Sequence, residues 1–264
     1  MTLREKENQL LEEWWNAHGN NPLFCYDGLH LVGKASKDSG AWEMDESDYP
    51  GKNEQVWNNS KVRCLFLTKD FNLNGDDEGV DIRKETGYDN STDGLYHHFY
   101  SRHLMLLYGL CHIDLKTGEY PPFEEASNQD VYWDYFMEAP VVRINVKKIA
   151  GGPKCSKSLL REYIKKDKDR LKNQIDLYNA NVIVVCNGAE TDNPILELVK
   201  EMHPDLRNIV LEGKGDPWVM YSAKDRVAVI WEWHMSQSVA YADYYDAVRH
   251  LSEAISSNQV ILYL

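Results

Sequence analysis

Four short apolar segments, each followed by polar residues, place the strongest constraint on how this chain folds. They cover residues 62–67, 141–146, 181–186 and 226–231. Each has the length of a strand and is apolar almost throughout, which is typical of a parallel strand covered on both faces. Helical patterns fill the stretches between them. Alternating strands and helices predict right-handed crossovers and a parallel sheet.

Helices are predicted where apolar residues recur at helical spacing or where a capping residue precedes such a run. They are expected over 3–15, over 95–110, from Ser156 or Ser158 to about Tyr178, from Asn193-Pro194 onward, and over 241–255. Acidic stretches with Gly or Pro predict long surface loops near 36–60 and 72–94. We therefore predict an α/β fold, a single three-layer domain over 1–264 with a central, mostly parallel four-stranded sheet flanked by helices.

Composition fits one globular domain in a reducing compartment. The chain has 264 residues, 43% of them apolar, which is near the upper limit for one hydrophobic core. There is no apolar run of about 18 residues and no secretory segment at the N-terminus, so no membrane contact is expected. The five cysteines are scattered and form no C-x-x-C pair. A cytoplasmic protein without disulfides is predicted.

The charge is unevenly distributed along the chain. The net charge of −13 argues against a general nucleic-acid binder, because phosphate contacts dominate that affinity. Residues 141–174, however, hold eleven Lys or Arg against three Asp or Glu. This basic stretch is interpreted either as a surface that meets nucleic acid or a nucleotide, or as a solvated basic helix.

Polar residues follow the predicted strands at the edge where open parallel sheets bind their ligands. Asp70, Asn145 and His234 supply a carboxylate, an amide and an imidazole there, which are a base, a two-way hydrogen-bonding group and a donor. Asp70 has a plain alternative as a turn residue, and His234 as a buried core histidine. Asn145 needs a partner, since an unpaired amide inside an apolar strand is costly. Neighbouring candidates for substrate binding are Phe71, Asn72, Lys147, Lys148 and Ser236.

These residues resemble the motifs of the uracil-DNA glycosylase superfamily and of its divergent bacterial members. That superfamily has a first strand ending in a Gly-Gln-Asp-Pro-like turn, a later strand with a base-reading Asn, and a last strand ending in His-Pro-Ser. The corresponding segments here are Leu67-Thr68-Lys69-Asp70-Phe71-Asn72, Arg143-Ile144-Asn145-Val146-Lys147-Lys148 and Trp233-His234-Met235-Ser236-Gln237-Ser238. The order is the same, and the resemblance spans roughly residues 62–238.

The resemblance implies N-glycosidic hydrolysis of a nucleobase in nucleic acid, a DNA-repair activity. Asp70 would activate a water toward the sugar, Asn145 would read the extruded base, and His234 would donate a hydrogen bond to the departing base. Phe71 would enclose the base. Lys147 and Lys148 would meet phosphates.

Two alternatives stay open. Lys69 and Met235 replace residues of the family motifs, which favours a module that kept the fold and binds a nucleotide or a partner without catalysis. The acidic exterior favours a hydrolase of a small nucleoside-like molecule. Phosphate-binding, dinucleotide-binding and nucleophile-elbow motifs are absent from the sequence. Neither the cysteines nor His97, His98, His103 and His112 have metal-site spacing, so no metal and no cofactor are expected.

Overall fold

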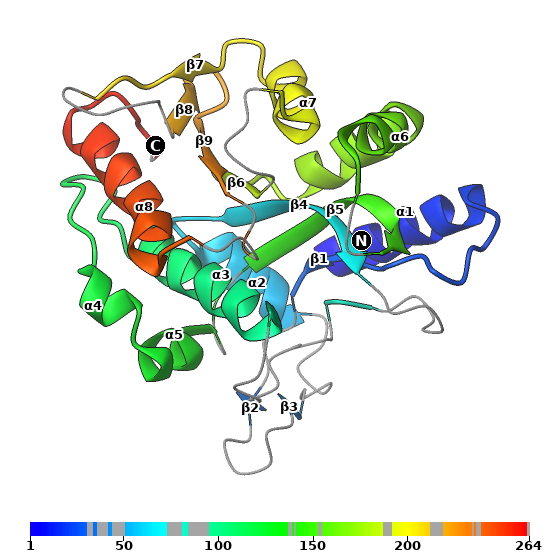
Figure 1. Ribbon diagram of the computed structural model, residues 1–264, viewed down its shortest axis with the longest axis horizontal. Coiled ribbons are helices and arrows are strands. Elements are labelled where there is room, and N and C mark those ends of the chain that lie inside the picture. The colour runs from blue at the N-terminus through cyan, green and yellow to red at the C-terminus, as the bar shows by residue number, and fades with distance from the viewer. Residues whose placement is uncertain are drawn as a thin grey trace.

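Seven strands form one mixed sheet in the computed structural model (Figure 1). The structure describes residues 1–30, 34–35, 42–43, 51–72, 81–83, 95–136, 139, 141–152, 155–186, 192–211, 219–233, 235 and 239–262. In spatial order the strands are β1 (Gly28–Leu29), β5 (Val141–Gly151), β4 (Cys64–Asn72), β6 (Val182–Cys186), β9 (Val227–Glu232), β8 (Val219–Ser222) and β7 (Arg207–Asn208). β5, β4, β6 and β9 pair in parallel, whereas β1–β5, β9–β8 and β8–β7 pair antiparallel.

The four predicted strands are therefore the contiguous parallel ones, but the predicted four-stranded, mostly parallel sheet is wrong in strand number and pairing. The sheet has seven strands, and three of its six pairings are antiparallel. The three additional strands are two to four residues long. Such segments are too short for a period of two to stand out in the sequence.

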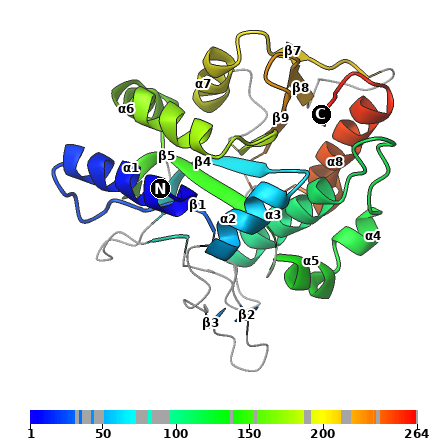
Figure 2. The ribbon, with the colours of Figure 1, turned by 180° about the vertical axis from the view of Figure 1, so that it is seen from behind.

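Helices cover both faces of the sheet, because successive strand residues point to opposite sides. On β4, Cys64 and Phe66 join a core with α3 (Leu95–Cys111), α4 (Phe123–Ala126), α5 (Gln129–Phe136) and α8 (Tyr241–Ser256). Leu65 and Leu67 join a second core with α1 (Leu3–Ala17), α2 (Gly51–Asn59), α6 (Lys157–Leu177) and α7 (Pro194–Met202). Figure 2 shows α3 and α8 side by side on their face of the sheet.

All five predicted helices are confirmed, and capping residues explain where three of them begin. The Ser156 hydroxyl accepts a hydrogen bond from the Leu159 N–H and starts α6. Asn193 caps α7, with Pro194 in its first turn. Thr2 and Glu5 form a capping box at the start of α1.

The predicted loop near 36–60 is wrong over its last third, because α2 occupies Gly51–Asn59. Trp57 anchors this helix: its side chain is buried and its indole N–H donates to the Tyr178 carbonyl at 2.8 Å. Two short strands, β2 (Lys34–Ala35) and β3 (Trp42–Glu43), pair with each other before it. Most of the loop predicted near 72–94 lies outside the described residues. None of the described helices is long and apolar enough to cross a bilayer.

Candidate functional site

A row of polar residues crosses one face of the sheet at the carboxyl ends of the parallel strands. Asn145 on β5 is the register partner of Thr68 on β4, and Cys186 on β6 is the partner of Glu232 on β9. Thr68 and Cys186 lie at the same position along the strand direction, because the preceding residues, Leu67 on β4 and Val185 on β6, are register partners. By strand alternation all four side chains face α3 and α8. The row spans three strand spacings, about 14 Å from end to end.

The side-chain amide of Asn145 is buried and is hydrogen-bonded at its oxygen end only. It is 3% exposed, and its Oδ1 accepts a hydrogen bond from the Thr68 hydroxyl at 2.6 Å. Its backbone N–H donates to Asp27 Oδ2 at 2.8 Å. Its Nδ2 has no hydrogen-bond partner within the described part of the chain. Buried amides are nearly always paired, so an unpaired donor at this position is unusual.

The next residues along the same two strands form an ion pair. The Lys147 ammonium lies 2.9 Å from Asp70 Oδ2 and donates to the Ile149 carbonyl at 2.6 Å. Both side chains are largely buried, and the Tyr163 ring lies 5.5 Å from the ammonium. Gly151 leaves room for the pair, because a Cβ there would lie 2.6 Å from Lys147 Nζ. Asp70 and Lys147, both predicted site residues, are thus together at the edge that also holds Asn145.

β5 is irregular where these polar residues lie. Asp70 pairs with Lys147 and Asn72 with Gly151, so two steps along β4 correspond to four along β5. Irregular ladders next to sites re-aim side chains. On the other side of β5, the Asn145 N–H donates a hydrogen bond to the Asp27 carboxylate. In a regular ladder the acceptor would be a backbone carbonyl. Asp27 thus acts as a side-chain acceptor at Asn145, two residues before the irregular part of β5 begins.

The β9 end of the row is Glu232, which is not among the site residues predicted from the sequence. Glu232 is fully buried; its Oε1 accepts the Trp233 N–H at 2.9 Å, and its Oε2 has no hydrogen-bond partner in the described chain. Burial raises the pKa of the Glu232 carboxyl well above its usual range, and nearby Asp246 adds to this shift. In the sequence it directly follows the apolar run 226–231, which is an ordinary position for a polar residue at a strand end.

Behind the row lies a buried basic group on the same face. Arg143, two residues before Asn145, is buried and interacts electrostatically with both His30 and His103. The His103 ring lies tilted against the Phe66 ring, at a centroid distance of 4.0 Å. Burial and the Arg143 charge lower the pKa of His103 to about 3, so this histidine stays neutral.

The chain that follows β9 is fastened to α3 by Arg102. The guanidinium donates to the Met235 carbonyl at 2.7 Å and to the Val239 carbonyl at 2.8 Å. It also lies over the rings of Tyr241 and Tyr244. The predicted site residues His234 and Ser236 lie outside the described residues, so the structure does not place them. Phe71 is half-buried beside Asp70, and the side chain of Asn72 is not described.

Lys148 does not join the predicted site. It points to the opposite face, where its ammonium is fully buried against the Asp27 carboxylate and lies 4.8 Å from the Trp14 ring. Gln174 on α6 donates to the same carboxylate at 3.0 Å. The expectation that Lys148 meets a phosphate is therefore corrected: the one-residue offset from Lys147 places it across the sheet.

Acidic residues offset much of the basic stretch 141–174. On α6, Arg161 pairs with Asp192 and Glu197, and Lys168 pairs with Glu201. These carboxylates belong to α7 and to the residues just before it. The basic stretch is thus partly neutralised within the fold, which weakens the attraction that it would exert on a polyanion.

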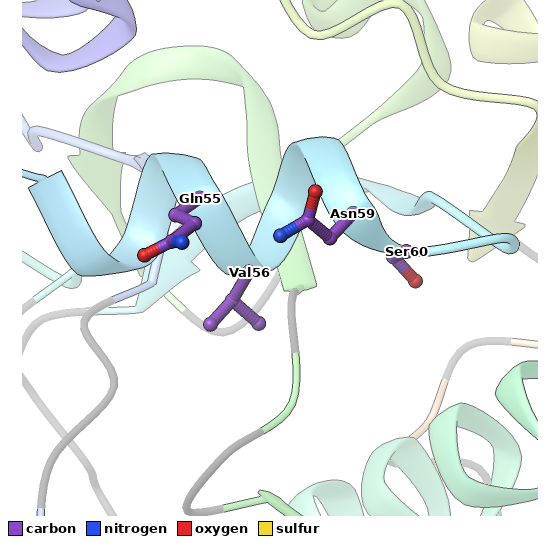
Figure 3. Close-up of a pocket in the computed structure, with 4 residues that line it drawn as sticks. All are labelled: Gln55, Val56, Asn59 and Ser60. Carbon is purple, nitrogen blue, oxygen red and sulfur yellow. The ribbon is translucent and has the colours of Figure 1, made fainter.

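A shallow depression of about 350 Å³ lies elsewhere, on α2, and is lined by Gln55, Val56, Asn59 and Ser60 (Figure 3). These residues directly precede β4, so the depression lies toward the amino end of that strand, away from the polar row. Ser60 is engaged locally, since its hydroxyl donates to the Val62 carbonyl at 2.6 Å. The depression therefore does not contribute to the candidate site.

Comparisons with protein-family models and with curated protein sequences find no match to this chain. The candidate site is therefore defined by the geometry of its residues.

Proposed function

We propose that this chain is a uracil-DNA glycosylase-like protein, a single three-layer domain that hydrolyses the N-glycosidic bond of a nucleobase at the carboxyl edge of its parallel strands. The proposal depends mainly on the hydrogen bonding of the Asn145 side chain. Its carbonyl oxygen is held by Thr68, and its Nδ2 is buried without a partner among the described residues. An amide fixed in this way presents a donor to a carbonyl oxygen of a planar base.

Asp70 supports the hydrolytic step. Glycosidic hydrolysis passes through an oxocarbenium-like state, which a nearby carboxylate stabilises. In the proposed reaction the C1′–N bond breaks and its electron pair leaves with the base. Water bonds to C1′ and loses a proton to Asp70. The Lys147 ammonium, 2.9 Å away, keeps the Asp70 carboxylate in place. His234 is proposed to donate a hydrogen bond to the departing base.

A free nucleoside or nucleotide is a second candidate substrate, and one observation favours it over nucleic acid. Two α6 cations that could meet a phosphate backbone, Arg161 and Lys168, are paired with Asp192, Glu197 and Glu201. The net charge of −13 acts in the same direction. A single nucleoside needs few phosphate contacts, so neither feature disfavours it.

The test is release of free base, measured by liquid chromatography, from uracil-containing single- and double-stranded oligonucleotides and from deoxyuridine and uridine. Wild-type protein is expected to release base from at least one of them. Asp70→Asn should lower the rate about 100- to 10,000-fold, the range of a lost general base. Asp176→Asn, an exposed carboxylate on α6, is the matched control and should behave as wild type.

Asn145→Ala separates catalysis from binding alone. A protein that binds nucleosides through Asn145 yet releases no base from any substrate would be the non-catalytic module. A wild-type protein that neither binds nor cleaves any member of the panel contradicts the proposal.

A further inference from the structure

Glu232 departs from the pattern of its own strand. Ala228 and Ile230, the preceding residues on the same face of β9, belong to the hydrophobic core beneath α3 and α8. Glu232 continues that face as a fully buried carboxyl group. An apolar residue there would complete the core, so the acid at this position requires a reason other than packing.

The hydrogen bonds of Glu232 are incomplete. Oε1 accepts the Trp233 N–H at 2.9 Å, whereas Oε2 has no partner in the part of the chain that the structure describes. The carboxyl group interacts electrostatically with Cys186 on β6, which also interacts with Arg143. Glu232 therefore lies beside Cys186, at the β9 end of the polar row. An unpaired oxygen in that position is free to meet a bound molecule.

We propose that Glu232 is a second ligand-binding group of the site, which donates a hydrogen bond to an oxygen of a bound nucleoside at the end away from Asn145. The inference rests on the proposed function, because it takes the ligand of Asn145 to be a nucleobase. It adds a residue and a ligand size to that proposal.

The carboxyl group acts as a donor because its surroundings favour the neutral form. Asp246 on α8 and Cys186 on β6 interact with it electrostatically. Asp246 adds repulsion, and the Trp233 N–H donates a hydrogen bond to it. Burial disfavours the charged form further. A protonated carboxyl offers one O–H donor, and Oε2 is the oxygen left to carry it.

The distance between Asn145 and Glu232 sets a minimum length for a ligand that contacts both residues. Asn145 and Glu232 are about 14 Å apart along the row, whereas each hydrogen bond bridges only about 3 Å. A single heterocycle held by Asn145 does not extend to Glu232. A base with its sugar attached is the smallest member of the proposed ligand class that reaches further. Sugar hydroxyl and ring oxygens are suitable acceptors.

The test compares Glu232→Met, which removes the donor, with Glu232→Gln, which keeps one. Glu253→Gln, at a partly exposed acid on α8, is the control. Affinities for uridine and for free uracil are measured by calorimetry on the full chain. We expect Glu232→Met to weaken uridine binding about tenfold to a hundredfold, and to leave uracil binding unchanged. Glu232→Gln and the control should stay within about threefold of wild type.

Thermal unfolding of the variants shows whether a loss of affinity is caused by a loss of the folded structure. Because Glu232→Met replaces an unpaired buried acid with an apolar side chain, its Tm should rise while its affinity for uridine falls. A lower Tm with unchanged affinity would mean that Glu232 is structural and would overturn the inference. Equal weakening of uracil and uridine would overturn it as well.

A measurement without ligand separates this inference from the proposed function. Carbon-13 NMR of the Glu232 carboxyl, assigned by its loss in Glu232→Gln, should show the protonated form at pH 7. An ionised carboxylate would refute the inference even if the wild-type protein cleaves nucleosides. If the carboxyl is protonated but no nucleoside or base binds to wild type, the proposed function fails and the ligand role of Glu232 fails with it.

Discussion

The Thr68 hydroxyl donates a 2.6 Å hydrogen bond to Asn145 Oδ1, across the parallel pair β4 and β5. This bond fixes which way the amide points, because only the carbonyl end can accept it. The amide nitrogen is thereby left buried and without a hydrogen-bond partner among the described residues. One short contact between register partners thus defines the polarity of the candidate site.

Thr68→Val removes this hydroxyl at nearly constant volume. The buried Asn145 Oδ1 loses its partner, so we expect a stability loss of about 1–3 kcal/mol in urea unfolding and weaker nucleoside binding. Thr68→Ser keeps the hydroxyl and should retain most of both. Equal behaviour of the Val and Ser variants would show that the hydroxyl does not orient the amide.

Gly151 and Gly152 offer a matched pair for testing the Asp70–Lys147 ion pair. An added Cβ at Gly151 would lie 2.6 Å from Lys147 Nζ and 3.0 Å from Asp70 Oδ2, whereas at Gly152 nothing lies within 4 Å. Gly151→Ala should displace the ion pair and lower base release about tenfold to a hundredfold, as small misplacements do. Because only side-chain ends must move, circular dichroism should stay unchanged. Gly152→Ala should be silent, and equal losses in both variants would contradict the prediction.

The Asp27–Lys148 pair lies on the opposite face and should behave as a buried structural ion pair. Removing either charge alone, by Asp27→Asn or Lys148→Met, should cost about 3–5 kcal/mol, because the remaining charge is buried without compensation. The double variant should cost clearly less than the sum of the two. Urea unfolding of the four proteins measures this coupling. Additive costs would mean that the two groups do not stabilise each other.

His103 should make the fold less stable in mild acid. Its pKa in the folded protein is lowered to about 3 by burial and by Arg143, whereas in the unfolded chain it titrates near 6.5. Between these values the unfolded state binds the extra proton, so stability falls as pH decreases, by up to about 1.4 kcal/mol per pH unit. Burial and Arg143 lower the pKa of His30 as well, which adds to the slope. His103→Phe should flatten the dependence measured by urea unfolding between pH 4 and 6; parallel slopes would contradict the assignment.

Part of the site was open to prediction from the sequence, because it depends on local order along strands. Asp70, Asn145 and Lys147 follow apolar runs, and the ends of parallel strands meet at one edge. Glu232 also directly follows an apolar run, 226–231, whereas Asp27 follows none of the four predicted strands. Each acquires its role from partners distant in the sequence: Asp27 from Asn145, and Glu232 from its position under α8.

The sequence by itself determined the elements whose signals are local. The parallel strands β5, β4, β6 and β9 follow from apolar runs, and the start of α6 follows from Ser156. Tertiary structure alone decided the added strands β1, β7 and β8 and the opposite fates of Lys147 and Lys148. The physical reason is that pairing, register and burial depend on which distant segments come together, and a shift of one residue along a strand sends a side chain to the other face.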